Sequence, residues 1–202
     1  MNAKTQIIVA GHGGQGVLEL ANCLSYYELL KGKHVAQTPS YGPETRGGKV
    51  KCYVVFSEHE IDSPLVERPD HLIVMNERSM EYVSLLKSGG ILLVNSSLVR
   101  EYPIRKDINS FKVPATAIAD GLKNSIVQRI QDTKIAANSV LFGSYLAITE
   151  RRLDLQMIRE VFNHFLTEKK AAYLELDLLG VKQGYEYMDN QIQEGTNPSI
   201  LA

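Results

Sequence analysis

The sequence of 202 residues has only two cysteines, and this shortage excludes several kinds of site. Cys23 and Cys52 form no Cys-x-x-Cys pair, so this chain alone cannot hold an iron–sulfur cluster through four thiolates. Each lies in a segment with a helix-like or strand-like pattern, where a cysteine is usually a small buried hydrophobe. We therefore expect neither a disulfide nor a metal site in this chain.

An excess of positive charge is also absent. The 22 Lys and Arg residues are balanced by 23 Asp and Glu residues, so no basic field attracts nucleic acid. No stretch approaches the roughly 20 apolar residues that cross a bilayer, and no basic segment followed by an apolar run stands at the N-terminus. We expect a cytoplasmic protein with neither a nucleic acid nor a membrane partner.

Glycine, by contrast, is concentrated near the start of the chain. The apolar segment 6–10 leads into Gly11-His12-Gly13-Gly14-Gln15-Gly16, and apolar residues at helical spacing follow. Unpaired N–H groups at a helix N-terminus point outward at the positive end of the helix dipole, and glycine lets a phosphate approach them closely. These residues are therefore a candidate anion site. The alternative, that the glycines only permit a tight turn, stays open.

The same glycines fit the G-x-G-x-x-G pattern of dinucleotide-binding domains, but one part of that pattern is missing. An acidic residue that holds a ribose hydroxyl is expected about 20 residues further on, at the end of the second strand. Residues 35–38 read Val-Ala-Gln-Thr instead. A phosphate site for another ligand is therefore favoured over an ordinary nicotinamide site.

The remaining patterns predict a Rossmann-like, three-layer α/β/α fold with a mostly parallel, mixed sheet and C-terminal helices. Short apolar runs between turn residues predict strands, and apolar residues at helical spacing predict helices. The strands follow the first one at 35–38, 49–56, 71–75 and 91–94, and the helices lie at 77–87, 135–148, 155–166 and 171–188. We expect a single domain over residues 1–190, with the C-terminal helices starting near 135, and an extended tail over 191–202.

A second glycine-rich segment, residues 38–48, contains Tyr41, Glu44 and Arg46 and is predicted to be a shaped loop. Because it leaves the second strand at the same sheet edge as the first glycine turn, Arg46 is placed to contact an anion held there. A guanidinium group suits phosphate. A solvent-exposed pair between Arg46 and Glu44 is the alternative.

Four linked motifs occur in order along the chain. They are Gly-x-Gly-Gly-Gln-Gly-Val at 11–17, Ser-Tyr-Gly-Pro-Glu-x-Arg-Gly-Gly at 40–48, Ile-x-Ser-Pro-Leu-Val at 61–66 and Gly-Gly-x-Leu-x-Val-Asn-Ser-Ser at 89–97. Together they resemble the gamma subunit of 2-oxoacid:ferredoxin (acceptor) oxidoreductases. The segment at 40–48 is most similar to the 2-oxoglutarate branch of that family, rather than to its pyruvate branch.

The resemblance implies a subunit of an enzyme that decarboxylates a 2-oxoacid, joins the acyl group to coenzyme A and passes two electrons to ferredoxin or flavodoxin. It also implies alpha, beta and delta-type partner subunits that carry thiamine diphosphate, Mg and iron–sulfur clusters. This chain would help form the coenzyme A site and would be inactive alone, with no catalytic residue of its own. A stand-alone dinucleotide-binding oxidoreductase and a purely structural assembly subunit remain alternatives.

The candidate coenzyme A contacts come from three segments. Asn95 and Ser96 follow a predicted strand, at the edge where ligands of open α/β sheets bind, although these side chains equally suit capping of the next segment. Tyr41 offers a ring to an adenine or a partner, and burial under its loop is the alternative. The full set is Gly11, His12, Gly13, Gly14, Gln15, Gly16, Tyr41, Glu44, Arg46, Asn95 and Ser96.

Overall fold

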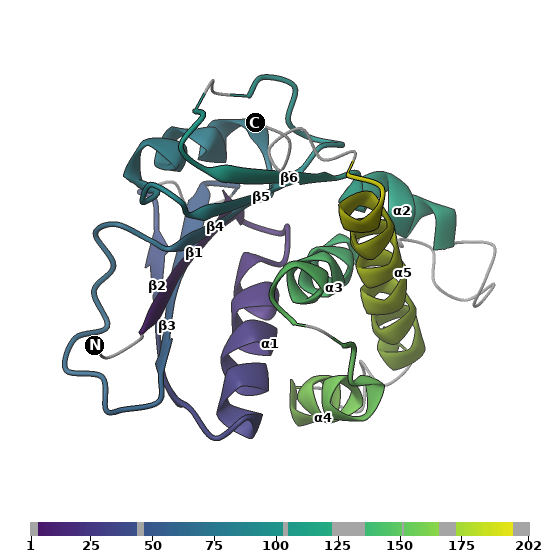
Figure 1. Cartoon of the computed structure of the whole chain (residues 1–202), viewed down its shortest axis with the longest axis horizontal. Coiled ribbons are helices and arrows are strands. Elements are labelled where there is room, and N and C mark those ends of the chain that lie inside the picture. Colours follow the sequence, from purple (N-terminus) through teal and green to yellow (C-terminus); the bar gives the residue numbers. More distant parts are fainter. Residues whose placement is uncertain are drawn as a thin grey trace.

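Six strands form one mixed sheet in the order β2-β3-β1-β4-β5-β6 (Figure 1). The computed structural model describes residues 4–43, 47–102, 105–122, 136–150, 152–165 and 173–195. Strands β1, β4, β5 and β6 are parallel, whereas β3 runs antiparallel between β1 and β2. The mixed, mostly parallel sheet expected from the sequence is confirmed. The strands are β1 (Thr5–His12), β2 (His34–Tyr41), β3 (Lys49–Ser57), β4 (His71–Val74), β5 (Ile91–Asn95) and β6 (Asn109–Val113).

The two faces of the sheet are covered by different kinds of structure. On one face lie the α-helices, and alternate residues of β1 such as Ile7 and Val9 are buried beneath them (Figure 1). On the other face Ile8 and Ala10 pack against the 3₁₀ helix η1 (Glu77–Leu85) and neighbouring loops. The α-helices are α1 (Val17–Leu30), α2 (Ala115–Gly121), α3 (Ala137–Thr149), α4 (Leu155–Phe165) and α5 (Leu174–Gln193). The layers are therefore those expected, but the second outer layer contains no α-helix among the described residues.

The helix predicted over 77–87 is thus a 3₁₀ helix. Its apolar residues Met80, Val83 and Leu86 recur every third position, and Val83 and Leu86 are buried. A 3₁₀ helix has about three residues per turn, so this spacing places all of them on one side. The side chain of Asn76 accepts a hydrogen bond from the Ser79 N–H at 3.1 Å and caps the first turn.

Two strands differ from the sequence expectation. Strand β6 was not predicted, because this edge strand pairs only with β5 and buries only Phe111 and Val113 among polar neighbours. Strand β2 continues to Tyr41, into the segment predicted to be a loop. Pro39 is tolerated there because β2 lies at the edge of the sheet.

The C-terminal helices correspond to the three helical segments predicted after residue 135. Helix α5 runs through Gln193, beyond the expected tail boundary at residue 190. Residues 196–202 lie outside the described residues, so the extended tail stays a prediction. Within the described ranges, no helix has the length and apolar character required to span a membrane.

Candidate functional site

The glycine-rich turn joins β1 to α1 and has a backbone that requires glycine at specific positions. Gly14 and Gly16 have φ angles of 89° and 78°, in the left-handed region that residues with a side chain rarely adopt. A Cβ atom on Gly16 would lie 2.6 Å from Nδ2 of Asn138 in α3. The turn therefore brings α1 and α3 close together. Gly13 and Gly14 themselves are exposed to solvent.

Gln15 holds this turn in shape. Its side-chain oxygen accepts a hydrogen bond from the His12 N–H at 2.7 Å and another from Nδ2 of Asn76 at 2.6 Å. The side-chain carbonyl is thus engaged within the protein, and the amide nitrogen of Gln15 is the group left to meet a ligand. Asn76 follows β4, so Gln15 also links the turn to the neighbouring strand.

Only part of the turn is able to donate backbone hydrogen bonds to an anion. The N–H of Gly13 donates to the carbonyl oxygen of Gly48 at 3.0 Å, and that of Gln15 donates to His12 at 3.1 Å. The N–H groups of Gly14 and Gly16, with those in the first turn of α1, remain as candidate donors. Fewer backbone N–H groups within residues 11–16 are therefore available to an anion than the sequence pattern suggests.

The second glycine-rich segment ends beside this turn. The hydrogen bond between Gly13 and Gly48 places the two segments at the same sheet edge, as the sequence predicts. The side chain of Tyr41 is 64% exposed rather than buried under a loop. Glu44 and Arg46 lie outside the described residues, so the predicted contact of Arg46 with an anion stays a prediction.

A cavity of about 640 Å³ opens at the C-terminal ends of β1, β4 and β5, where α/β sheets bind ligands. The first turns of α1, α2, α3 and α5 all reach it. Its lining comprises Gly14, Gln15, Gly16, Glu19, Asn22, Cys23, Met75, Asn95, Leu98, Thr116, Ala137, Asn138, Phe162, Phe165, Tyr173 and Asp177. The structure thus brings together the glycine turn and Asn95, which lie far apart in the sequence.

The cavity is acidic. Glu19 and Asp177 contribute carboxylates, and no lysine, arginine or histidine is among the described residues that line it. Asp177 accepts a hydrogen bond from Oγ of Ser139 at 2.7 Å. Burial raises the pKa of the Cys23 thiol, and the nearby carboxylates of Asp177 and Glu19 add to this effect. Cys23 is therefore a protonated wall residue and not a nucleophile.

The side chains of His12 and Lys49 lie on the opposite face of the sheet. His12 pairs with Lys49 across β1 and β3, and the alternation along β1 places both on the face covered by η1. Lys49 forms an ion pair with Glu81 at 2.9 Å. The Nδ1 atom of His12 is buried and has no hydrogen-bond partner among the described residues. The charge of Lys49 on this face is thus balanced by the carboxylate of Glu81.

Asn95 and Ser96 have structural contacts. Asn95, only 1% exposed, donates to Oγ1 of Thr116 at 2.9 Å and accepts from the Ser97 N–H at 3.3 Å. Oγ of Ser97 accepts from the Ala117 N–H at 3.1 Å, so these side chains tie the end of β5 to α2. The backbone N–H of Ser96 donates to Val113 at 2.9 Å, and its side chain does not line the cavity. Asn95 also lines the cavity.

Comparison with known proteins places this geometry in a family. Residues 6–187 match the family model described as "Pyruvate ferredoxin/flavodoxin oxidoreductase". The chain belongs to this family. The family suggested by the four sequence motifs is thereby confirmed.

Individual relatives support the same assignment. The 2-oxoglutarate synthase subunit KorC of Methanothermobacter thermautotrophicus is 38% identical over 160 residues, which cover 74% of this chain and 77% of that protein. The ketoisovalerate oxidoreductase subunit VorA of the same organism is 31% identical over 94% of this chain, and the chain spans only 38% of its length. The crystal structure of a keto/oxoacid ferredoxin oxidoreductase gamma subunit from Geobacter sulfurreducens superposes with a TM-score of 0.73 at 27% identity, covering 91% of this chain and 95% of that one.

The fold of this family member disfavours the alternative of a dinucleotide-binding site. Strand β3 separates β1 from β2, so the end of β2 lies two strand spacings from the glycine turn, about 10 Å away. Gln37, at the position of the missing acid, donates to Asn22 at 2.8 Å and accepts from Ser25 at 2.7 Å. Its side chain fastens β2 to α1 and is not available to a ribose.

The sequence analysis did not find the far wall of the cavity. Asn138 lies in the helical segment predicted at 135–148, and Phe162 and Phe165 lie in the one predicted at 155–166, where their spacing favours the helix core. Phe162 is 7% exposed and does belong to the core, but all three also line the cavity. Only the packing of α3, α4 and α5 brings these residues to the glycine turn. The one feature of the local sequence that could have indicated this wall was a polar asparagine within an apolar helical segment.

Proposed function

We propose that this chain is the gamma subunit of a 2-oxoacid:ferredoxin oxidoreductase that acts on 2-oxoglutarate. Membership of the pyruvate ferredoxin/flavodoxin oxidoreductase family supports the class of enzyme. The 2-oxoglutarate substrate is supported by the similarity to KorC proteins, one of which is 38% identical over 160 residues. Within such a complex the chain joins alpha, beta and delta-type subunits, which carry thiamine diphosphate, Mg and the iron–sulfur clusters, and ferredoxin or flavodoxin accepts the electrons.

The role proposed for this chain is to help form the coenzyme A site. The observation that supports it is the exposed glycine turn at the mouth of a 640 Å³ cavity. The N–H groups of Gly14 and Gly16 and the N-terminus of α1 suit the phosphates of coenzyme A. The described residues include no group of three His, Cys, Asp or Glu side chains that would hold a metal ion. The proposal assigns binding groups to this chain and the redox chemistry to the partner subunits.

Assembly is tested by purifying a tagged chain from its native cell and identifying the proteins that accompany it. The proposal expects a thiamine-binding subunit and a cluster-bearing subunit in fixed ratio, together with 2-oxoglutarate-dependent reduction of ferredoxin. Recovery of the chain alone, without activity in the eluate, would contradict it. Activity with another 2-oxoacid in place of 2-oxoglutarate would overturn the substrate assignment only.

The coenzyme A site is tested by amide hydrogen exchange on the assembled complex. Coenzyme A should slow exchange of peptides covering residues 13–20 severalfold, because its phosphates hydrogen-bond to those amides. The peptide covering β6 (Asn109–Val113), at the far edge of the sheet, serves as the control and should not change. Unchanged exchange over 13–20 at saturating coenzyme A would refute this role.

A further inference from the structure

The charges around the glycine turn limit where the phosphates of a ligand can bind. The cavity side carries Glu19 and Asp177 without a cationic lining residue among those described. A phosphate inside the cavity would face two carboxylates in a partly desolvated space, where repulsion between like charges is strong. Phosphates are therefore expected at the solvent-exposed rim of the turn, at the N–H of Gly14, and not deep inside the cavity.

The cavity itself suits a planar ring that donates hydrogen bonds. Phe162, Phe165 and Tyr173 supply aromatic walls, and the volume of about 640 Å³ lies within the usual range for small-molecule sites. Carboxylates accept hydrogen bonds and cannot donate them when ionised. A ring that carries an amino group matches such a lining, whereas a ring with only acceptor atoms does not.

Glu19 is better placed than Asp177 to meet that amino group. One oxygen of Asp177 already accepts the Ser139 hydroxyl, which ties α5 to α3. Glu19 is exposed, lines the cavity and lies in the first turn of α1, where the helix dipole stabilises its negative charge. It also stands three residues after Gly16, next to the amides proposed to hold phosphate.

We infer that the cavity binds the adenine ring of coenzyme A, with Glu19 accepting a hydrogen bond from the exocyclic amine and the phosphates held outside on the glycine turn. This inference rests on the proposed coenzyme A role and specifies the part of the ligand that each side of the turn recognises. The glycine turn then carries an anion site at its solvent-exposed rim, next to a base pocket on the helix face.

The test compares coenzyme A with an analogue in which purine replaces adenine, so that only the amino group is lost. Binding of each to the assembled complex is measured by calorimetry. The wild-type complex should bind coenzyme A about tenfold more tightly, the usual effect of one hydrogen bond to a charged group. Glu19→Ala should reduce this preference to about one, by weakening coenzyme A while leaving the analogue unchanged.

Glu175→Ala is the matched control. Glu175 is also a glutamate in the first turn of a helix, but it pairs with Arg159 on the surface and does not line this cavity. Its variant should keep the tenfold preference. Equal binding of both ligands to wild type, or a preference that survives Glu19→Ala, would overturn the assignment of the base. If coenzyme A binds but does so without this preference, only the present inference fails, whereas absence of exchange protection over 13–20 would refute the proposed coenzyme A role itself.

Discussion

Gly143 of α3 and Gly184 of α5 lie at the crossing of the two helices, each directly against the backbone of the other helix. A Cβ atom on Gly143 would overlap the carbonyl oxygen of Val181, and one on Gly184 would overlap that of Val140. The Oγ atom of Ser144 lies 3.0 Å from the carbonyl oxygens of both Val140 and Gly184. This close crossing fixes the first turns of both helices, which carry Asn138 and Asp177 into the cavity.

Gly143→Ala and Gly184→Ala should each destabilise the chain by about 3 kcal/mol or more, because the added methyl group forces the two backbones apart. For a protein of this size, that lowers the midpoint of thermal unfolding by roughly 6–12 °C. Gly121→Ala is the control, since nothing lies within 4 Å of a Cβ atom there. Calorimetric scans of the purified complex check this, and a change below about 2 °C for Gly143→Ala would contradict the crossing described.

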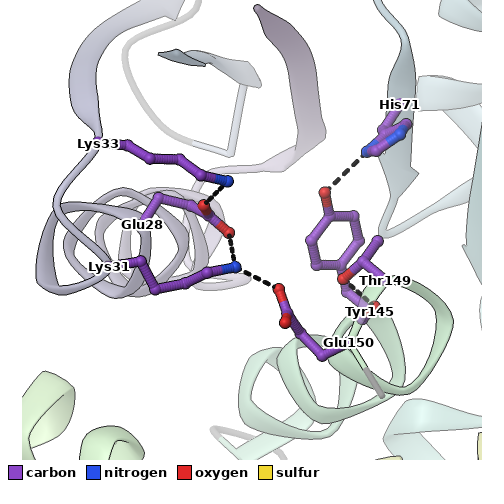
Figure 2. A network of polar contacts seen from close by, with 7 residues as sticks. All are labelled: Glu28, Lys31, Lys33, His71, Tyr145, Thr149 and Glu150. Atoms are coloured by element: carbon purple, nitrogen blue, oxygen red, sulfur yellow. Dashed lines mark hydrogen bonds and ion pairs between the residues drawn. The ribbon is translucent and has the colours of Figure 1, made fainter. Parts of the chain in front are cut away.

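The buried pair of His71 and Tyr145 predicts a dependence of stability on pH. Nδ1 of His71 lies 2.7 Å from the Tyr145 hydroxyl oxygen (Figure 2). Burial lowers the pKa of His71 to about 4 from its ordinary value of 6.5. The unfolded chain therefore binds one more proton than the folded chain between these two values, and stability is lost as pH falls from about 6.5 to 4.

The loss attributable to this group should not exceed about 3 kcal/mol. Urea unfolding at a series of pH values measures it, and His71→Gln should flatten the slope between pH 6.5 and 4, whatever its effect at neutral pH. An unchanged slope in the variant would show that other groups are responsible. Tyr145, whose pKa burial raises well above 10, stays protonated throughout this range.

Glu28 is the centre of the ion-pair network at the other end of α1. It is 5% exposed, and its carboxylate lies 2.7 Å from Nζ of Lys33 and 3.4 Å from Nζ of Lys31, which also meets Glu150 at 2.6 Å (Figure 2). Glu28→Gln should cost about 2–4 kcal/mol, because it removes the carboxylate that pairs with the partly buried ammonium group of Lys33 and leaves Lys31 with Glu150 alone.

The exposed pair of Lys49 and Glu81 supplies the matched control for Glu28. Both of its side chains are more than 40% exposed, so Glu81→Gln should change the free energy of unfolding by less than about 1 kcal/mol. Chemical unfolding of the two variants side by side decides the matter. Equal losses in the free energy of unfolding would mean that burial does not strengthen the ion pairs of Glu28.

Gln15→Ala should loosen the glycine turn and weaken coenzyme A binding by the assembled complex about tenfold. The substitution leaves the His12 N–H and the Asn76 amide without the oxygen they share, at a cost of about 1–3 kcal/mol. Titration of the complex with coenzyme A measures the loss. Gln183→Ala, on the exposed side of α5, should leave the affinity as it was. An unaltered affinity in Gln15→Ala would show that the ligand does not depend on this turn.

Pro39 protects the open edge of the sheet. The Gly42 N–H donates to the Lys49 carbonyl oxygen at 2.8 Å, so the backbone N–H and C=O groups of even-numbered residues in β2 point toward β3. The backbone groups of odd-numbered residues, including the nitrogen of Pro39, point outward from the sheet edge. Pro39→Val restores an outward N–H and should promote pairing between copies, seen as concentration-dependent growth in light scattering. Thr38→Val is the control: it raises β-propensity without adding a backbone donor, so the particle size of this variant should not depend on concentration. Unchanged scattering in Pro39→Val would show that another feature prevents pairing between copies at this edge.

Local patterns in the sequence predicted the elements that depend on neighbouring residues. The strand, glycine turn and helix over 6–24 are encoded within a few residues of one another, and so is the conformational demand at Gly14 and Gly16. The prediction that both glycine-rich segments share one sheet edge was confirmed by the hydrogen bond between Gly13 and Gly48. Strand β6 was missed because an edge strand half exposed to water lacks the apolar run that marks a buried one.

The fold class, the glycine turn and the family could be predicted from the amino-acid sequence, because each depends on short stretches whose residue types restrict the backbone. The cavity required the folded structure: Glu19, Asn138, Phe162 and Asp177 come from four helices, and the approach of α3 and α5 depends on the crossing at Gly143 and Gly184. The same holds for the acidic lining of the cavity. Glu19 and Asp177 come from α1 and α5, whose approach follows from helix packing, which a local pattern does not contain.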